Sequence, residues 1–513
     1  MLLVDGAMAG RALFPTNGSS LLYTNTYSDT NLWWFNYNAG DIPPNSLTNW
    51  TNMEVMVDWS FNSSTFGVSN VNTNTRQIFL TFSNWAGGGG GSPWQSVLDI
   101  QTYRVYNTAD GMSQPGQFYY DRSNQIVTYW PIGGKPPTNS QIIVPTTDRM
   151  WFLYGYAGGA GPHDVTFSNL TMKVLAVDRE AEGPFAFNWD YMSLIDFYRA
   201  CGSSNITVEN CTLGWCGGNA IGSDYGYVTN FNIINNEIGY CGNYGLAARM
   251  AGPVVVSNNY IHDCGLITWQ APGVRVNTNA LVTQNNLFNF HTSAIADHDV
   301  DNCVFSLNSI SNCMFTEEDM GAYYQYFGSY TTLAHPHGNV VTSNLFQSVG
   351  TNYNDESANP NWPDNRNKYR PAVYLDEQSS NTLVSANQTI GCPTPSFLNL
   401  AFFNTLSNNL NINTNSVAGY DCVRRYASSG TNDQSANNVL INNWDYGVAT
   451  NVYDAATGST NAYSTISNNI TYSTNPAGIA GLPTGFITNN STFPTLILQQ
   501  VPGGNGVQAY TPH

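Results

Sequence analysis

The chain has 513 residues, of which only 10% are charged, well below the roughly 25% of an ordinary soluble domain. Acidic residues outnumber basic ones 34 to 16, so the formal net charge is −18 and no basic surface offsets repulsion of phosphate backbones. We therefore expect no nucleic-acid partner, and no apolar run approaches the roughly 18 residues of a membrane span. Asn, Ser, Thr, Gly and Tyr replace the missing charges, and their neutral hydrogen-bonding groups suit stacked polar ladders and sugar-binding surfaces.

The N-terminal segment and the cysteines say little about location. MLLVDGAMAG (1–10) has no basic start and soon reaches Asp5, so we do not interpret it as a signal peptide. The nine cysteines include no C-x-x-C pair of the metal or redox kind, and their odd number leaves at least one thiol unpaired. We therefore expect small apolar core residues rather than a disulfide framework.

Residues 22–147 predict a separate antiparallel β unit. Strand-like runs of alternating polarity, such as 53–61 and 76–82, are rich in aromatic residues and are separated by turn residues. The Gly87–Gly91 run lacks a following Gly-Lys-Ser/Thr, which favours a surface loop over a phosphate-binding loop. The tryptophans are interpreted as core residues, with sugar stacking as the alternative.

The next segment repeats with a period in the low twenties. Five copies lie at 206–218, 232–243, 255–266, 282–293 and 304–315. Aligned, they give an asparagine column, an apolar column two residues further on, and a cysteine column in which His291 replaces one cysteine. The columns are Asn236, Asn259, Asn286 and Asn308; Leu213, Ile238, Ile261, Phe288 and Ile310; and Cys216, Cys241, Cys264 and Cys313.

This period predicts one coil of a parallel β-helix. It is too short for helix–turn–helix repeats, and the L-x-x-L-x-L signature of leucine-rich repeats is absent. Each coil adds about 4.8 Å along the axis, the spacing of hydrogen-bonded strands. Weaker copies follow at 340–346, 382–390, 438–444 and 464–470. We therefore predict an all-β chain, a right-handed parallel β-helix of the pectate-lyase-like type over 148–480 with an inserted antiparallel β-sandwich over 22–147.

Several segments then resemble motifs of one group of β-helix carbohydrate enzymes, glycoside hydrolase family 141 and its relatives, whose activities include α-L-fucosidase and xylanase. The segments are VDGAMAGRALFP (4–15), PGQFYYDRSNQIVTYWP (115–131), VTFSNLTMK (165–173), EDMGAYY (318–324) and AVYLDEQSSN (372–381). The resemblance implies that 1–21 form a leading β-helix strand without the section that usually precedes it. We interpret 481–513 as a C-terminal capping tail.

Cleavage of a glycosidic bond uses two carboxyl groups. The resemblance implies Asp319 and Asp376, which are 57 positions apart, or 36 without the apparent 21-residue insertion at 351–371. That spacing is one to two coils, so we expect roughly 5–10 Å between the carboxyl groups, which covers both retaining and inverting geometries. Glu318 and Glu377 are alternatives for the acid, since close carboxylates raise one another's pKa. For Asp319 and Asp376 the structural alternative is that they cap turns or form hydrogen bonds to adjacent coils.

Nine further residues are candidates for substrate contacts: Tyr323, Tyr324, Tyr374, His291, His298, His335, His337, Arg249 and Arg275. Half of the tyrosines should face the core, because side chains alternate along a strand. The His335–His337 pair lacks the spacing of known zinc motifs, so we expect no metal cofactor, with structural calcium at the Asp/Asn turns as the alternative. Each arginine either binds an acidic sugar or pairs with a neighbouring acid.

These features favour a glycoside hydrolase whose partner is a fucoside- or xyloside-containing polysaccharide or oligosaccharide. The substrate class alone suggests an extracellular location. A non-catalytic glycan-binding adhesin or viral fibre is the first alternative, and it also fits the low charge. A polysaccharide lyase is the second, but a lyase needs a base and cations that neutralise uronates, and lysine is scarce near the repeats.

Overall fold

The computed structural model describes most of the chain. The described residues are 1–16, 21–28, 33–58, 63–80, 102–147, 149–155, 161–176, 192–197, 202–222, 228–248, 252–267, 269, 271–298, 300–315, 320–327, 337–350, 370–392, 394–399, 401–412, 420–424, 437–446, 453–454, 463–472, 486–488, 498–500 and 508–510. No helix among them is long and apolar enough to cross a membrane.

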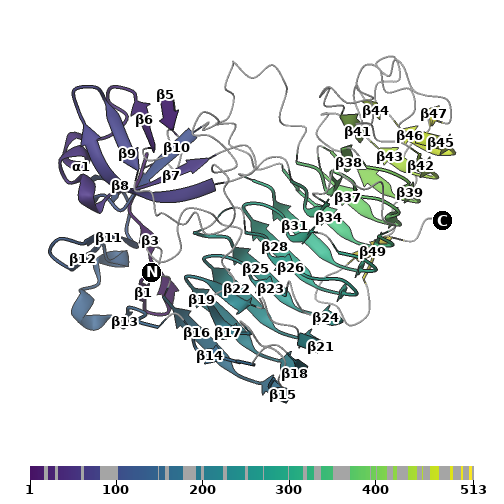
Figure 1. The fold of residues 1–513 in the computed structure, drawn as a ribbon, viewed down its shortest axis with the longest axis horizontal. Helices are drawn as coiled ribbons and strands as arrows, with labels where there is room; N and C mark the ends of the chain where they lie inside the picture. The colour runs from purple at the N-terminus through teal and green to yellow at the C-terminus, as the bar shows by residue number, and fades with distance from the viewer. Residues whose placement is uncertain are drawn as a thin grey trace.

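Three parallel sheets run the length of the solenoid, and successive coils add one strand to each (Figure 1). Sheet A holds β14 (Trp151–Phe152), β17 (Ser193–Asp196), β20 (Asn219–Gly222), β23 (Leu246–Ala247), β26 (Val274–Arg275), β29 (Ile295–His298), β32 (Tyr323–Tyr326), β35 (Val373–Leu375), β38 (Ser396–Asn399), β41 (Tyr420–Arg424) and β44 (Tyr453–Asp454). Sheet B holds β15 (His163–Ser168), β18 (Ser203–Glu209), β21 (Val228–Ile234), β24 (Val254–Ser257), β27 (Leu281–Thr283), β30 (Val304–Ser306), β33 (Val340–Thr342), β36 (Leu383–Ser385), β39 (Thr405–Ser407), β42 (Asn438–Ile441) and β45 (Tyr463–Ser467). Sheet C holds β16 (Thr171–Leu175), β19 (Thr212–Cys216), β22 (Glu237–Cys241), β25 (Tyr260–Cys264), β28 (Asn286–Phe290), β31 (Ser309–Cys313), β34 (Leu345–Gln347), β37 (Gln388–Ile390), β40 (Leu410–Ile412), β43 (Trp444–Tyr446), β46 (Asn469–Tyr472) and β47 (Phe486–Thr488).

Alternation along each strand puts every second side chain into the core. In sheet C the inward column is Leu213, Ile238, Ile261, Leu287 and Ile310, at paired positions of neighbouring strands. All five are at most 1% exposed, so each coil buries apolar surface only by stacking on the next. The predicted parallel β-helix is therefore confirmed. The weaker repeats between 340 and 470 also supply strands to sheets B and C.

An asparagine ladder fixes the two-residue turn from sheet B to sheet C. The first turn residue adopts positive φ, as at Asn235 (57°) and Asn258 (55°), a conformation that asparagine tolerates. The second residue is buried, and its Oδ1 accepts the main-chain N–H of the ladder residue one coil earlier, as from Asn236 to Asn259 at 2.9 Å. Its Nδ2 donates to a carbonyl inside the coil. The described ladder is Asn236, Asn259, Asn285, Asn308, Asn344, Asn387, Asn409, Asn443 and Asn469.

The fourth repeat differs from the predicted alignment by one residue. Asn285 occupies the ladder rather than Asn286, and Leu287 and Phe290 occupy the apolar and cysteine columns rather than Phe288 and His291. The motif NNLFNF offers an asparagine and an apolar residue in either register. Because a one-residue shift moves every side chain to the other face, the buried ladder bonds select one register.

The N-terminal antiparallel unit is one sheet that closes on itself. Its strands are β4 (Leu13–Phe14), β5 (Leu21–Ser28), β6 (Trp33–Tyr37), β7 (Glu54–Asp58), β8 (Ser63–Asn72), β9 (Gln77–Leu80) and β10 (Thr102–Tyr106). The order is β4-β10-β5-β6-β9-β8-β7, and β10 also pairs with β7. Register shifts in β5 and β8 accompany the closure, as irregular pairs allow strands to bend. The predicted antiparallel unit is therefore present and is closed by the β7–β10 pair, and the Gly87–Gly91 run lies outside the described residues.

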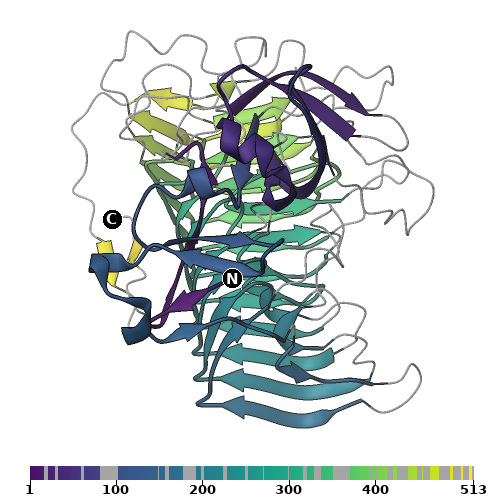
Figure 2. The same cartoon turned by 90° about the vertical axis from the view of Figure 1, so that its left-hand side faces the viewer.

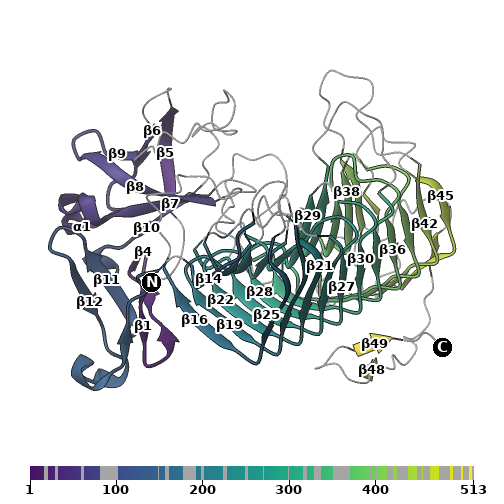
Figure 3. The same cartoon turned by 60° about the horizontal axis from the view of Figure 1, so that its bottom comes forward.

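Short elements connect the strands of this barrel or flank it in the chain. They are α1 (Pro44–Thr48), η1 (Trp50–Asn52), η3 (Ala109–Gly111), η4 (Ile132–Gly134), η5 (Pro137–Asn139), β1 (Leu3–Val4), β2 (Ala7–Met8), β3 (Gly10–Arg11), β11 (Gln117–Asp121), β12 (Ile126–Tyr129) and β13 (Ile142–Ile143). β1 pairs antiparallel with β2 and β13, so it joins none of the three parallel sheets and forms no leading coil. Near the C-terminus, β48 (Leu498–Gln500) and β49 (Gln508–Tyr510) pair antiparallel (Figure 3).

The N-terminal strands, purple in Figures 1 and 2, lie along one side of the β-helix. A cation–π contact bridges the two parts: the Arg104 guanidinium of β10 lies 4.2 Å from the centre of the Trp269 ring, which follows β25. Both side chains are buried, so the contact is shielded from solvent.

Candidate active site

Some coils are longer than others, and their additional residues lie next to the strands of sheet A. Successive ladder asparagines are 22–26 positions apart in most coils, but 36, 43 and 34 apart in three of them. Since the turn from sheet B to sheet C keeps two residues, the additional residues enter before or after the strands of sheet A. Loops at strand ends often carry function. The two longest spacings enclose β32 and β35, which hold the motifs singled out in the sequence.

Tyr323 and Tyr324 face opposite sides of sheet A. The Tyr323 ring lies 4.9 Å from the ring of Phe305, a core residue of sheet B, and its hydroxyl donates to Asp297 at 2.6 Å. Tyr323 is fully buried, and burial together with the Asp297 carboxylate raises the pKa of its phenol well above the usual value. Tyr323 therefore belongs to the interior of the β-helix and has no surface on which to contact a substrate.

Four residues on the outer side of sheet A form what we call the Asp376 cluster: Tyr324, Tyr374, Asp376 and Asn399. The Asp376 carboxylate accepts hydrogen bonds from the Tyr324 hydroxyl (2.7 Å) and the Asn399 amide (2.8 Å). The main-chain N–H of Glu377 also donates to it, at 2.8 Å. The rings of Tyr324 and Tyr374 are paired in register and meet at 5.3 Å. Three donors stabilise the charged carboxylate and hold it in one orientation.

The cluster is largely enclosed, since Asp376 and Tyr324 are 6% exposed and Tyr374 is 1% exposed. Glu377 is partly buried beside it. Asp319 and Glu318, the other candidate carboxyl groups, lie outside the described residues. The motif that contains them nevertheless meets β35 through Gly321, where an added Cβ would lie 2.8 Å from the Cβ of Tyr374. Only glycine allows this approach without a shift of the backbone.

Arg275 lies in the same outer column of sheet A as Tyr324. The column runs from Arg275 through Ala296 and Tyr324 to Tyr374 on successive strands. Arg275 is buried, and its guanidinium donates to the Tyr244 hydroxyl at 3.4 Å. It is thus two coils from Tyr324, about 10 Å along the axis. Arg249 lies outside the described residues.

His291 is at the junction with the barrel. Its ring stacks on Trp269 with centroids 4.6 Å apart and an interplanar angle of 4°, and it meets Phe315 at 4.5 Å. Burial, with a smaller contribution from the Arg104 charge, lowers the pKa of His291 to about 3. The structure therefore puts a neutral imidazole into an aromatic stack, away from the Asp376 cluster.

The other histidines occupy different places. His337 contacts Asp301 through Nδ1 at 2.5 Å, and its ring stacks on Phe327 with centroids 3.4 Å apart. His298 ends β29, and its backbone pairs with Tyr326 of β32. His335 lies outside the described residues. The structure thus brings Tyr324, Tyr374, Asp376 and the more distant Arg275 to one face, and His291 lies elsewhere, on Trp269.

Asn399 was missed by the sequence reasoning. It belongs to no recognisable motif, and its role depends on β38 stacking next to β35 so that its amide reaches Asp376. The usable signal would have been the coil register, which makes Asn399 two positions beyond the Tyr374 column. Within the described part of the chain, no group of three or more His, Cys, Asp or Glu side chains is arranged to hold a metal ion.

Comparison with known proteins supports the class of fold. A family model described as a right-handed beta helix region matches residues 199–359. No curated protein matches the sequence. A solved structure titled "Glycoside hydrolase" matches with 14% identity and a TM-score of 0.59, covering 80% of this chain and 76% of that one.

Two further solved structures are similar at lower TM-scores. The complex of XylC with xylose is 12% identical with a TM-score of 0.41, and it covers 95% of this chain and 76% of that one. The catalytic unit of a GH87 alpha-1,3-glucanase from Streptomyces thermodiastaticus strain HF3-3 is 12% identical with a TM-score of 0.37, covering 95% and 100%. The family-model match and the structure with the TM-score of 0.59 support a right-handed β-helix, and that structural neighbour is titled a glycoside hydrolase at low identity.

Proposed function

We propose that this chain is a glycoside hydrolase acting on a fucoside- or xyloside-containing polysaccharide, with Asp376 and Asp319 as its carboxyl pair. The observation that carries the proposal is the Asp376 cluster on the outer face of sheet A. Tyr324, Asn399 and the Glu377 N–H donate hydrogen bonds to the Asp376 carboxyl group and hold it in one orientation. A carboxyl group that accepts from donors on both oxygens suits the nucleophile or base of such a reaction rather than its acid.

A second carboxyl group must then act as the general acid. Asp319 is the first choice because the motif that carries it resembles the family motif, and because Gly321, two positions later, contacts Tyr374. Glu318 and Glu377 remain alternatives, since a carboxyl group beside a charged carboxylate holds its proton more strongly. Such an enzyme would meet its polymeric substrate outside the cell, so we extend the proposal to an extracellular location.

Non-catalytic glycan binding is the second candidate function. The observation that favours it is the enclosure of Asp376, which is 6% exposed and has hydrogen-bond donors on both carboxylate oxygens. A purely structural carboxylate between two coils makes the same contacts. The two functions differ in one respect, which is that only a hydrolase produces new reducing ends.

The test is replacement of Asp376 by asparagine. An amide has the same shape and can donate through Nδ2 to the Tyr324 oxygen while its Oδ1 accepts from Asn399 and the Glu377 N–H. We therefore expect Asp376→Asn to change the free energy of unfolding by less than about 1 kcal/mol, while it removes the carboxyl group needed for catalysis. On a panel of aryl fucosides and xylosides, and on xylan, we expect kcat to fall by at least about 10³-fold, as for loss of an essential catalytic group.

Asp319→Asn is expected to be equally inactive, and Asp164→Asn is the matched control because Asp164 is exposed on β15. Reducing-end release by the wild type and by the Asp164 variant, with none from the other two, supports the proposal. Wild-type turnover by the Asp376 variant removes that residue from the mechanism. No product from the wild-type chain on the whole panel favours the binding function.

A further inference from the structure

A continuous aromatic row follows the outer face of sheet C, away from the Asp376 cluster. Trp215 meets Tyr240 at 4.9 Å, Tyr240 meets His262 at 5.1 Å, and His262 stacks on Phe288 at 5.1 Å with an interplanar angle of 15°. The four residues come from β19, β22, β25 and β28, so the row runs parallel to the axis. Tyr260 lies beside it, 4.6 Å from His262 and 5.2 Å from Phe288.

The backbone is adapted to this row. An added Cβ at Gly239 would lie 2.5 Å from the His262 ring, so glycine lets the imidazole lie flat on the strand below. At the other end of the row, the Lys173 ammonium lies 3.6 Å from the centre of the Trp215 ring. The row is therefore a fixed surface rather than a set of unrelated exposed side chains.

His262 carries a buried polar atom without a hydrogen bond. The residue is 4% exposed, and its Nδ1 contacts the Asp263 carboxylate at 2.7 Å. Among the described residues its Nε2 has no hydrogen-bond partner, and a carboxylate oxygen of Glu237 lies 3.9 Å from it. A buried nitrogen in this state costs free energy that a bound hydroxyl group or a shift of Glu237 would recover.

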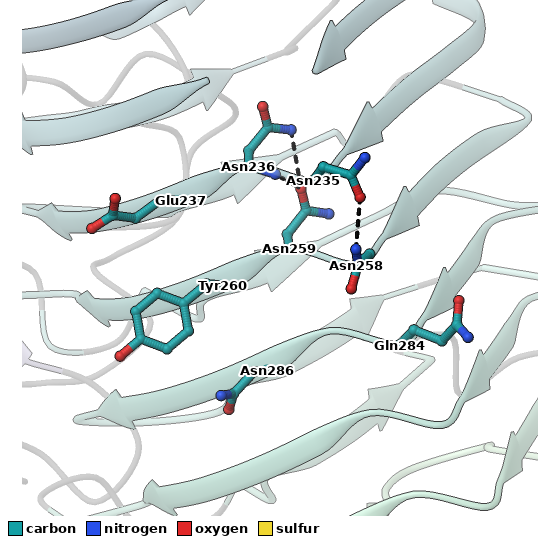
Figure 4. A pocket seen from close by; sticks show the side chains of 8 residues that line it. All are labelled: Asn235, Asn236, Glu237, Asn258, Asn259, Tyr260, Gln284 and Asn286. Carbon is teal, nitrogen blue, oxygen red and sulfur yellow. Dashed lines mark hydrogen bonds between the residues drawn. The ribbon is translucent and has the colours of Figure 1, made fainter. Parts of the chain in front are cut away.

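A polar pocket of about 270 Å³ opens beside the row. In Figure 4, Glu237, Tyr260 and Asn286 project on one side, and the turn residues Asn235, Asn258 and Gln284 lie on the other. The ladder residues Asn236 and Asn259 also line the pocket, between these two sides. Tyr260 is 37% exposed, which makes it the accessible ring of the group.

We propose that this face of sheet C is a second, non-catalytic binding site for a neutral sugar chain. Apolar faces of sugar rings would pack on Tyr260 and the row behind it, while Glu237 and the pocket amides would hydrogen-bond their hydroxyl groups. The axial course of the row fits an extended chain lying along the solenoid. Glu237 and Asp263 repel uronate and sulfate groups, so the site selects neutral glycans.

The site needs no bond cleavage and so goes beyond the proposed hydrolase function. The test is native affinity electrophoresis of the full chain in gels containing xylan, hydroxyethylcellulose or laminarin, with polygalacturonate as the acidic polymer. We expect retardation by at least one neutral polymer and none by polygalacturonate. Tyr260→Ala should raise the Kd about tenfold, equivalent to about 1.4 kcal/mol.

Three variants complete the design. Tyr260→Phe keeps the ring and should bind like the wild type, and Trp151→Ala removes an aromatic side chain that is 50% exposed on β14 and should leave retardation unchanged. Asp376→Asn should also be retarded, because the site is on another sheet. If the wild-type chain is retarded by a neutral polymer but hydrolyses none of the substrates, the proposed hydrolase function is wrong and the second binding site is supported. Absence of retardation by every neutral polymer, or equal Kd values for Tyr260→Ala and the wild type, would overturn the second site.

Discussion

Exchange of Asn285 for alanine tests the ladder and its register together. The Asn285 Oδ1 accepts from the N–H and the amide of Asn259, each at 3.0 Å. Its Nδ2 donates to the carbonyl of Val256 at 2.9 Å and to Asn308 at 3.0 Å. Asn285 is fully buried, so water cannot replace these bonds. The neighbouring Asn286 lines the pocket on the outer face and is partly exposed.

The loss of stability in Asn285→Ala can be estimated from the buried hydrogen-bonding groups that lose their partner. The Asn259 N–H loses its acceptor outright, which costs about 1–3 kcal/mol for a buried group. The Asn259 amide keeps its bond to Ile233, and Asn308 still accepts the N–H of residue 285, so the remaining losses are smaller. We expect Asn285→Ala to destabilise the coil by about 3 kcal/mol, and Asn286→Ala by less than about 0.5 kcal/mol.

Hydrogen-exchange mass spectrometry of residues 255–264 is the direct assay, because coils of a solenoid open locally. Faster exchange in this segment is expected for the Asn285 variant and not for the Asn286 variant, with the thermal midpoint falling in the same order. Equal effects of the two substitutions, or a larger effect at Asn286, would refute the register and the role given to the ladder.

Two other predictions concern the aromatic contacts. The pKa of His291 is about 3 in the folded chain and about 6.5 when unfolded, so only the unfolded state takes up a proton between these values and stability falls as the pH drops below about 6.5. His291→Phe should keep the stack on Trp269. Between pH 7 and pH 4.5 its free energy of unfolding, measured by denaturant titration, should fall by about 2 kcal/mol less than that of the wild type. Parallel pH profiles of the two proteins would contradict this. Gly239→Ala should displace His262 and lower stability by about 1–3 kcal/mol, whereas Gly10→Ala, whose Cβ would lie 3.6 Å from its nearest neighbour, serves as the control in thermal unfolding.

The sequence was sufficient for the β-helix because its period depends on local features. A two-residue turn with one positive φ recurs along the described coils, and its second residue is a buried asparagine from Asn236 onward. Asparagine also serves the positive-φ position in several of these turns. Where both positions and their neighbours are ambiguous, as around Asn285 and Asn286, the pattern does not fix the register. Closure of the N-terminal sheet was not predictable, because the β7–β10 pair joins segments about 50 positions apart.

The site was predictable only in part for a related reason. Asp376 and Tyr324 could be named from their motifs, but their hydrogen bond depends on two coils whose connections differ in length. The contact with Phe305 shows that Tyr323 points into the core. Because side chains alternate along a strand, Tyr324 then points outward. The burial of Arg275 and the stacking of His291 on Trp269 depend on packing between distant elements and left no trace in the spacing.

The unequal coil lengths described above have a consequence for how such a chain can diversify. Insertions beside sheet A change the number of residues between ladder asparagines from 22 to 43, yet the amide contacts keep nearly the same length. The stacking of the coils therefore does not depend on the length of these loops. Surfaces bordering Asp376 can therefore be enlarged or exchanged without a change in the core, whereas a single residue added between Asn235 and Asn236 would break the two-residue turn and the ladder bonds of that coil.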